Sequence, residues 1–334
     1  MTFQALRAEE NIFKNCHIAV LGDIMLDTFV YGDVNRISPE APVPVLRVRK
    51  SINTMGGAGN VASNLAALGA TVSLIGRIGA DAGGEEFMRQ AKAAGIDASN
   101  LISGTLPTTR KTRIVSRGQQ IVRIDEEETD ALDDIATKHV LNTLKALRKK
   151  TDTIVVSDYD KGVIGQSMLE EIKTIWKGGN ILVDPKPRKN IDYSGVTTMT
   201  PNTSEAAALL GDESGAKTDA EAADVATRLF KKFKLKHVLL TRANDGMTLH
   251  DGKDIHHFKP PSIVEIRDVS GAGDTVMALM AAGIAAGLLL DDTVELATFG
   301  GKIVVSKTGT ATVTWPELIE DMKASGKFPP YVFR

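Results

Sequence analysis

Short apolar runs, separated by segments with helical periodicity, recur along most of the chain and constrain its fold more than any other feature. The runs lie at residues 18–21, 72–75, 153–156, 181–183 and 238–240, and Val61, Leu65 and Leu68 mark one of the helical segments between them. Strands that alternate with helices form βαβ units, in which helices cover both faces of a mainly parallel sheet. The sequence therefore predicts an α/β fold of this kind, with ligands bound at the carboxyl ends of the strands.

Two segments, residues 28–52 and 108–125, depart from this alternation. Both contain stretches in which apolar and polar residues alternate, which is typical of half-exposed strands. We expect them to form a small, antiparallel sheet that projects from a single domain spanning residues 1–334. Its apolar face, near residues 43–48 and 113–124, predicts a two-fold symmetric homodimer. The acidic run at 125–130 is expected to be a solvated loop that leads back into the main domain.

Charge and cysteine content exclude several classes of protein. With a formal net charge of −2 and a pI of about 6.3, the chain has no global basic field that would gather nucleic acid. The single cysteine, Cys16, cannot form an internal disulfide, which fits a reducing cytosol. Residues 1–15 lack the apolar core of a secretory signal, and the longest apolar run, 275–290, is short for a membrane span and contains two glycines. We therefore expect a soluble, cytoplasmic protein, with a terminal helix and a loose end after Trp315.

The segment Asp268-Val-Ser-Gly-Ala-Gly-Asp-Thr275, which leads into that apolar run, carries the strongest functional signal. Gly271, Ala272 and Gly273 can present backbone N–H groups at a helix N-terminus, where the helix dipole also favours anions. The carboxylate of Asp274 beside such an anion hole is electrostatically out of place unless it serves as a base. Phosphoryl transfer needs this pairing of phosphate donors with a base for the attacking hydroxyl. The alternative is a capped, buried helix whose glycines are packing spacers.

A second glycine-rich segment, Gly57-x-Gly59-x-x-Ala62, matches the dinucleotide-binding fingerprint. That fingerprint requires a preceding buried strand, whereas residues 49–54 are polar. A close approach of the Gly57 backbone to a polyol, with Asn60 hydrogen-bonded to its hydroxyls, fits better. A plain glycine-rich helix entry is the alternative.

Acidic and amide side chains elsewhere could also bind a ligand. Asp23 and Asp27 follow the first apolar run, where a carboxylate can accept hydrogen bonds from sugar hydroxyls or can simply cap a turn. Asn202 and Glu205, three residues apart, can hold magnesium-bound waters near nucleotide phosphates or can form a helix capping box. No P-loop motif occurs, and the histidine pair at 256–257 lacks nearby ligands for zinc.

Cations also recur in the expected loops and in the small sheet, where one or two of them could bind a substrate phosphate although each could equally be a solvated surface residue. They are Arg36, Lys111, Arg113, Arg117, Lys161 and Lys186.

Taken together, these motifs resemble the ribokinase-like (PfkB) family of carbohydrate kinases. Gly56-Gly57 with Asn60 is similar to the N-terminal signature of that family, residues 268–274 to its C-terminal signature, and residues 202–205 to its Asn-x-x-Glu motif. The matches follow the expected order from Gly22 to Thr312. The resemblance implies an ATP-dependent enzyme with a ribokinase-like fold and a small β-sheet lid, which often forms the dimer.

Three further segments resemble one group within the family, the bacterial heptose 7-phosphate kinases. They are residues 36–45, 157–162 and 307–312, with Asp160 as a departure where glycine would be expected. The resemblance implies phosphorylation of the anomeric (C1) hydroxyl of D-glycero-β-D-manno-heptose 7-phosphate to the 1,7-bisphosphate, for the lipopolysaccharide inner core. The chain resembles a stand-alone kinase of this group or the kinase half of a protein that also carries a nucleotidyltransferase.

The resemblance also implies roles for individual residues. The implied catalytic residues are the base Asp274 and the anion hole of Gly271, Ala272 and Gly273. The implied sugar ligands are Asp27, Gly57 and Asn60, with Asp23 beside them, and the candidates for the substrate phosphate are Arg36, Lys161 and Lys186. Asn202 and Glu205 are implied to organise Mg²⁺ and the ATP phosphates, while Thr241 and Gly246 are implied to lie along the nucleotide.

Three alternatives remain open. The chain could be a kinase of another sugar or sugar phosphate in the same family. It could be a nicotinamide-dependent dehydrogenase built on the Gly57 fingerprint, which a nicotinamide titration would reveal. It could also be a sugar or nucleotide sensor without catalysis, which any release of ADP above background would exclude.

Overall fold

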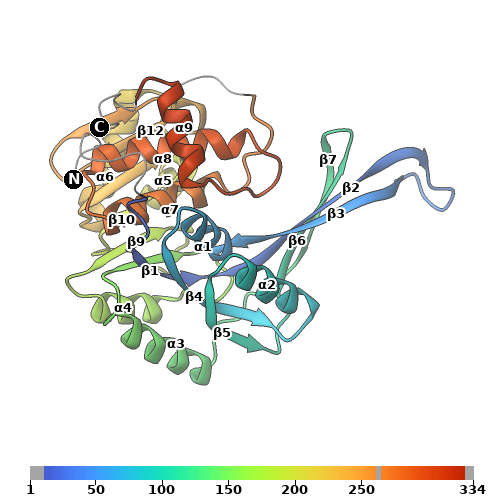
Figure 1. Cartoon of the computed structure of the whole chain (residues 1–334), viewed down its shortest axis with the longest axis horizontal. Coiled ribbons are helices and arrows are strands. Elements are labelled where there is room, and N and C mark those ends of the chain that lie inside the picture. Colours follow the sequence, from blue (N-terminus) through green and yellow to red (C-terminus); the bar gives the residue numbers. More distant parts are fainter. Residues whose placement is uncertain (1–10, 261–264, 328–334) are drawn as a thin grey trace.

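The computed structural model describes residues 11–260 and 265–327, so the expectations for the first ten residues and for the end after residue 327 lie outside the described residues. Its main body is built on a nine-stranded sheet (Figure 1). The strands from β11 to β5 run parallel, whereas β12 and β13, at one edge of the sheet, pair antiparallel. In spatial order the strands are β13 (Ile255–Phe258), β12 (Met247–His250), β11 (His237–Thr241), β10 (Thr198–Met199), β9 (Asn180–Asp184), β8 (Thr153–Ser157), β1 (His17–Gly22), β4 (Thr71–Gly79) and β5 (Asp97–Gly104). All the apolar runs that predicted buried strands lie within strands of this sheet.

Helices cover both faces of the large sheet, as the alternating pattern predicted. The side chains of β1 alternate between two apolar cores, with Ile18 and Val20 in one and Ala19 and Leu21 in the other. The first core includes residues of α1 (Ala58–Ala67), α2 (Ala82–Ala93), α7 (Ala272–Ala285), α8 (Leu290–Val305) and α9 (Trp315–Ala324). The second includes residues of α3 (Asp134–Leu147), α4 (Gln166–Ile175), α5 (Thr203–Leu210) and α6 (Asp219–Phe233).

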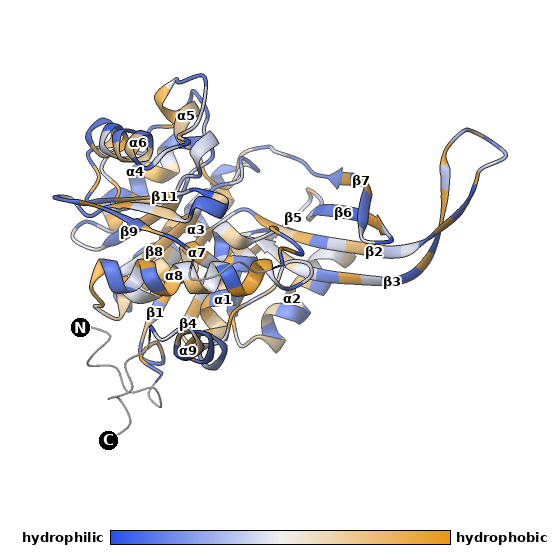
Figure 2. Cartoon of the chain, turned by 90° about the horizontal axis from the view of Figure 1, so that it is seen from above, coloured by the Kyte–Doolittle hydropathy of each residue, from blue (hydrophilic) through white to orange (hydrophobic). Residues whose placement is uncertain are grey.

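A separate four-stranded sheet projects from the main body as a long twisted ribbon (Figures 1 and 2). Its strands, in the order β3-β2-β6-β7, are β3 (Pro44–Gly57), β2 (Ile24–Ile37), β6 (Thr109–Ser116) and β7 (Gln119–Glu126). The small sheet predicted from residues 28–52 and 108–125 is therefore present, but β2 begins earlier and β3 ends later than expected. The expectation of purely antiparallel pairing is wrong, because β2 and β6 are parallel. Both strands leave the main body in the same direction, which makes their pairing parallel.

The junction between the two sheets is short and tightly fixed. Only Asp23 separates β1 from β2, and Gly57 ends β3 directly before α1. Gly57 has a φ of 57°, and a Cβ added there would lie 2.5 Å from the carbonyl oxygen of Asp23. The Ala58 N–H donates to that same oxygen at 3.0 Å. The start of β2 and the end of β3 are thus held together at one point. Glycine is needed at position 57 because a side chain would collide with the Asp23 backbone.

The long apolar run at 275–290 forms most of α7, whose residues from Asp274 to Gly283 are buried. It is therefore a core helix, as expected. No helix in the part of the chain that the structure describes is long and apolar enough to cross a membrane. The terminal helix expected after Trp315 is α9.

Candidate active site

Asp274, the predicted base, lies in the first turn of α7 and has only 3% of its surface exposed. Its Oδ2 accepts a hydrogen bond from Asn60 Nδ2 at 2.8 Å, and its Oδ1 accepts one from the phenol of Tyr159 at 2.8 Å. The two donors come from α1 and from the loop after β8. Three segments far apart in the sequence therefore fix the position of this carboxylate.

Burial controls the acidity of Asp274. Loss of solvation raises its pKa to about 7, and the nearby Asp27 carboxylate adds to the rise, whereas the hydrogen bonds from Asn60 and Tyr159 oppose it. A general base works best when its pKa lies near the operating pH. The environment of Asp274 gives it that property without any second titrating partner such as histidine.

The N-terminus of α7 lies beside this carboxylate and carries no side-chain cap. Its first N–H groups have no partner within the helix, although that of Ala272 donates to the Val269 carbonyl oxygen, outside the helix, at 3.3 Å. Gly271 has a φ of 78°, and a Cβ there would lie 2.3 Å from Asn60 Nδ2, so a side chain would displace the residue that holds Asp274. At Gly273 an added Cβ would meet nothing within 4 Å, so the helix start is open on that side. An open, uncapped helix N-terminus is suited to bind phosphate oxygens.

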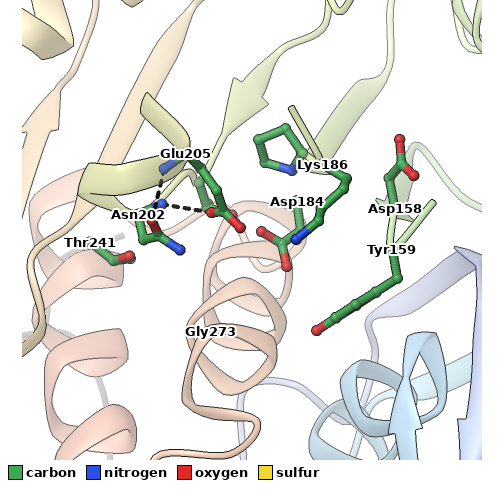
Figure 3. A pocket seen from close by; sticks show the side chains of 10 residues that line it. Asp158, Tyr159, Asp184, Lys186, Asn202, Glu205, Thr241 and Gly273 are labelled. Carbon is green, nitrogen blue, oxygen red and sulfur yellow. Dashed lines mark hydrogen bonds between the residues drawn. The ribbon is translucent and has the colours of Figure 1, made fainter. Parts of the chain in front are cut away.

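A cavity of ≈ 150 Å³ opens at this helix end (Figure 3). Its walls come from the carboxyl ends of neighbouring strands of the large sheet and from the starts of α5 and α7, where parallel sheets bind ligands. The lining residues are Asp158, Tyr159, Asp184, Pro185, Lys186, Thr200, Asn202, Glu205, Thr241 and Gly273.

Carboxylates crowd this cavity. Burial raises the pKa of Asp184 well above its usual range, and the neighbouring charges of Asp274 and Glu205 raise it further, with Lys186 as the opposing influence. The pKa of Glu205 is also raised by burial. Figure 3 shows the Lys186 side chain extending toward the carboxylates of Asp184 and Glu205. The cavity therefore gathers carboxyl groups whose charged forms a bound cation would stabilise.

Of the two alternatives for Asn202 and Glu205, the helix capping box is present. They form the capping box of α5, in which Asn202 Oδ1 accepts from the Glu205 N–H and Glu205 Oε2 accepts from the Asn202 N–H, each at 2.9 Å. Both also line the cavity. Since the capping box uses one oxygen of each side chain, the Asn202 amide nitrogen and Glu205 Oε1 remain available to a ligand.

Two of the predicted sugar ligands, Asp23 and Asn60, are engaged in hydrogen bonds inside the protein. Asp23 is 1% exposed, and its carboxylate accepts the backbone N–H groups of Tyr159, Lys161 and Val163. Asn60, also 1% exposed, donates to Asp274 and accepts from Asn64 Nδ2. Asp23 thus holds the loop after β8, and Asn60 orients the base.

Asp27 lies near the base, since its charge contributes to the raised pKa of Asp274. Gly56, the neighbour of Gly57, lies against Asp27, because an added Cβ there would be 2.5 Å from Asp27 Oδ2. Asp27 Oδ1 accepts from Arg113 Nη1 at 2.6 Å, and Oδ2 accepts from Thr310 Oγ1 at 3.1 Å. Thr310 belongs to the segment 307–312 that the sequence comparison singled out. The segments 157–162 and 307–312 therefore meet at this site with β2.

The three candidate cations for a substrate phosphate lie in three different places. Arg36 is exposed near the far end of β2, nine residues beyond Asp27, which corresponds to about 30 Å along a strand. Lys186 lines the cavity together with Asn202 and Glu205. Lys161 instead pairs with Glu127, at 2.7 Å. Their separation reflects three elements whose relative positions the sequence did not reveal.

Thr241 and Gly246, predicted to lie along the nucleotide, differ in their surroundings. Thr241 ends β11 and lines the cavity. Gly246 follows a short 3₁₀ turn, η2 (Ala243–Asp245), and is not among the residues that line the cavity. An added Cβ at Gly246 would lie 1.9 Å from the carbonyl oxygen of Phe258, so its backbone alone explains the glycine.

The sequence analysis did not single out Tyr159 or Asp184 as site residues. Asp184 directly follows the apolar run 181–183, and Tyr159 comes three residues after the run 153–156, so their position after a predicted strand was a usable signal. Most of the acidic run 125–130 is exposed, as expected, although its first two residues belong to β7. Glu127, in the run expected to be solvated, has a side chain only 27% exposed and pairs with Lys161. The departure at Asp160 has a local explanation, because its φ of 58° is accompanied by an ion pair with Arg188.

The site and the fold first define a class: an α/β enzyme with a buried carboxylate beside an open helix N-terminus, the arrangement that phosphoryl transfer to a hydroxyl requires. The chain belongs to the pfkB family of carbohydrate kinases, since the model of that family, described as "pfkB family carbohydrate kinase", matches residues 16–318. The predicted enzyme class, an ATP-dependent carbohydrate kinase, is confirmed at the level of this family.

Relatives and solved structures agree with this assignment. The "Bifunctional protein HldE" of Shewanella amazonensis is 38% identical over 312 residues, which cover 93% of this chain and 64% of the relative. The chain thus spans less than two thirds of that protein. Phosphofructokinase-2 from Escherichia coli, in complex with substrates and products, has a TM-score of 0.76 at 18% identity and covers 93% of this chain and 99% of its own. Ribokinase from Arabidopsis thaliana, complexed with ribose and ATP, has a TM-score of 0.71 at 18% identity, with 94% and 99% covered. The predicted ribokinase-like fold is confirmed.

Proposed function

We propose that this chain transfers the γ-phosphoryl group of ATP to the anomeric C1 hydroxyl of D-glycero-β-D-manno-heptose 7-phosphate, giving the 1,7-bisphosphate for ADP-heptose and lipopolysaccharide core synthesis. The observation that carries the kinase chemistry is the pairing of Asp274 with the open N-terminus of α7. The sugar assignment is supported by segments 157–162 and 307–312, which resemble the heptose 7-phosphate kinases and contribute Tyr159, Lys161 and Thr310 to this site. The similarity to bifunctional HldE proteins is in keeping with it.

Asp274 would act as the base. Asn60 and Tyr159 hold its two oxygens in place, and a pKa of about 7 leaves a large share of the carboxyl deprotonated at neutral pH. The accepting hydroxyl would give its proton to Asp274 as its oxygen bonds to the γ-phosphorus of ATP, and the bond from that phosphorus to the ADP oxygen breaks in the same transfer. The N–H groups at the start of α7, around Gly271, Ala272 and Gly273, would donate to the oxygens of the transferred group, over which its charge is spread in the transition state.

Asn202, Glu205 and Asp184 would hold the ATP phosphates and Mg²⁺. Mg²⁺ usually binds through one or two carboxylates together with substrate phosphates, and when bound it neutralises phosphate charge. The raised pKa values of Asp184 and Glu205 reflect carboxylates without enough positive charge around them, which fits a site for a cation. In the described residues no three His, Cys, Asp or Glu side chains are grouped closely enough to hold a metal alone.

We further propose that residues 1–334 form one kinase domain in which the small sheet is both a lid over the sugar and a dimer interface. The strand register places Asp27 and Arg113 on one face of that sheet and Val122 and Ile124 on the opposite face. Figure 2 shows hydrophobic segments in orange along the ribbon. Val48, Val122 and Ile124 are 57%, 46% and 49% exposed. An exposed apolar surface of this kind usually marks an interface. The cytoplasmic location expected from the sequence remains a prediction.

A coupled assay of ADP release with a panel of sugars tests the proposed reaction. The panel contains the heptose 7-phosphate, the same heptose without phosphate, fructose 6-phosphate and ribose. The heptose 7-phosphate should give the highest kcat/KM, with Mg²⁺ required, and the product should carry its new phosphate at C1. A higher kcat/KM for another member of the panel would replace the heptose assignment while leaving the kinase assignment in place.

A further inference from the structure

Two lysines near the catalytic base share a single counter-ion. Lys161, in the loop after β8, donates from Nζ to Glu127 Oε1 at 2.7 Å. Lys111, on β6, has its Nζ 3.8 Å from Glu127 Oε2 and 3.8 Å from Asp125 Oδ2. Only 16% of each lysine side chain is exposed. Two largely covered ammonium groups therefore lie on either side of one carboxylate.

The positive charge of this pair is incompletely neutralised. The carboxylate of Asp125 is already engaged by Arg123, through contacts of 2.9 Å to each of its oxygens. Lys111 Nζ is beyond hydrogen-bond distance of both carboxylates, so its donors find no acceptor among them. The Glu127 oxygen nearest to Lys111, Oε2, is buried and makes no hydrogen bond to Lys111 or to any other described residue. Burial lowers the pKa of Lys111 even though Asp125 and Glu127 oppose the change. The pair thus has donors and charge to spare for an anion.

The position of the pair relates it to the sugar rather than to the nucleotide. Lys111 is the register partner of Asp27 across the β2–β6 pairing, so their side chains leave the same face of neighbouring strands, which lie about 4.8 Å apart. The backbone N–H groups of Lys161 and Tyr159 both donate to Asp23 Oδ2, and Tyr159 then reaches Asp274. Neither lysine lines the cavity that holds Asn202 and Glu205.

We propose that Lys111 and Lys161 form the subsite for a phosphate monoester at the end of the sugar remote from the accepting hydroxyl, and that Glu127 is the counter-ion which this phosphate displaces. The inference rests on the proposed sugar-kinase function and assigns its anionic handle. A phosphate dianion can accept hydrogen bonds from both ammonium groups at once, whereas Glu127 accepts from only one. A sugar without the phosphate would leave Glu127 in place.

The test compares kcat/KM for heptose 7-phosphate with kcat/KM for the same heptose lacking phosphate, in the wild type, Lys111→Met and Lys161→Met. Methionine keeps the length and packing of the side chain and removes the charge. Each variant should lose about 10- to 100-fold on the phosphorylated sugar, the usual effect of losing a charge-assisted hydrogen bond. On the free sugar it should stay within about twofold. Lys145→Met, at an exposed lysine of α3, is the matched control. Equal losses on both sugars, or no loss on either, would overturn the subsite.

Glu127→Gln tests the role of the counter-ion. The variant removes the competing negative charge, so the KM for the phosphorylated sugar should fall several-fold while the KM for the free sugar stays unchanged. A higher KM for the phosphorylated sugar would mean that Glu127 orients the lysines instead, and would overturn its displacement.

Two outcomes separate this inference from the proposed function. If the wild type prefers another sugar phosphate, the heptose assignment fails, and the same comparison with that ester and its free sugar decides the subsite. If the wild type phosphorylates esters and free sugars equally well, the subsite is overturned and the kinase stands. Inorganic phosphate gives a readout that needs no turnover: at constant ionic strength it should raise the Tm of the wild type more than that of Lys111→Met. Equal shifts would overturn the subsite.

Discussion

Carboxylates lie both at the carboxyl ends of the large-sheet strands, where α7 begins, and on the inner face of the small sheet. The two groups differ in whether a positive charge neutralises them. At the large sheet, Asp274 and Asp184 are buried with too little positive charge around them, and their pKa values rise. On the small sheet, Asp27 pairs with Arg113 at 2.6 Å and Asp125 pairs with Arg123 at 2.9 Å. Burial without neutralisation prepares a group to accept a proton or a cation, whereas pairing fixes a group in one charge state.

The difference suggests that residues at the large sheet carry out phosphoryl transfer and that residues on the small sheet select the sugar. Substitutions at the large sheet should lower turnover whatever the sugar carries. Substitutions on the inner face of the small sheet should change which sugar is used. The predictions below are ordered by the size of their expected effect on catalysis.

The largest effect is expected for Asp274→Asn, which keeps the shape of the side chain but cannot accept the hydroxyl proton. We expect kcat to fall on the order of 10²–10⁴-fold, with ATP affinity little changed. Asp33→Asn is the matched control, because the Asp33 carboxylate on the small sheet is exposed and pairs with Arg49. Steady-state kinetics with separate ATP titration provide the measurement. Near-normal kcat in Asp274→Asn would show that another group is the base.

A smaller loss is expected for Lys186→Ala. Lys186 is the only lysine or arginine among the residues that line the cavity, so its removal leaves Asp184, Glu205 and the ATP phosphates without a fixed cation. We expect kcat/KM for ATP to fall about 10- to 100-fold, by the same factor with phosphorylated and unphosphorylated sugar. A loss confined to the phosphorylated sugar would assign Lys186 to the sugar phosphate and break the division between the two sheets.

Tyr159→Phe should have a modest effect whose signature is its pH dependence. The phenol stabilises the charged form of Asp274, so its removal raises the pKa of that carboxyl further above about 7. Since the base is active when deprotonated, the rise of kcat with pH should move upward by about one pH unit. At pH 7 the loss should be roughly 3- to 10-fold, and it should diminish above pH 8. A loss that is equal at all pH values would assign Tyr159 a purely structural role.

The smallest effect on turnover is expected at the apolar face of the small sheet. Ile124→Asp places a charge on a surface where the wild-type side chain is 49% exposed, and should convert a homodimer into monomers by light scattering. Because Asp274, Asn60 and Tyr159 all belong to one chain, kcat per chain should remain within about threefold. Gln119→Asp, at an exposed position of the same strand, is the control. A wild type that is already a monodisperse monomer at micromolar concentration would contradict the dimer.

In the large sheet, the sequence revealed the strands that are continuous apolar runs and missed the strands that are not. Apolar runs identified β1, β4, β8, β9 and β11, because both faces of these strands are covered by helices. β13 escaped because its residues, among them His256 and His257, are only partly buried. The parallel register of β2 with β6 could not be predicted, since it depends on how two distant segments leave the main body.

At the site, the sequence identified the reacting groups better than it identified the hydrogen bonds that hold them in place. Asp274 and the glycines before it form a contiguous motif, so the base and the anion hole could be proposed from adjacent residues. The role of Asn60 could not, because its bond to Asp274 joins residues 214 positions apart. The contacts of Asp23 were equally hidden, since only the fold shows that three backbone N–H groups donate to its carboxylate.

The anchoring of the ribbon at Asp23 and Gly57 has a mechanical consequence. Asp27 lies four residues from this pivot and Ile37 fourteen, which corresponds to about 13 Å and about 46 Å along β2 at roughly 3.3 Å per residue. If the ribbon swings as a stiff arm, each displacement at Asp27 is magnified about 3.5-fold at the tip. A sugar that draws Asp27 inward by the width of one atom would sweep the far end of the arm across several times that distance. A small ligand bound near Asp27 would thereby change the position of the far end of the ribbon, which it does not touch.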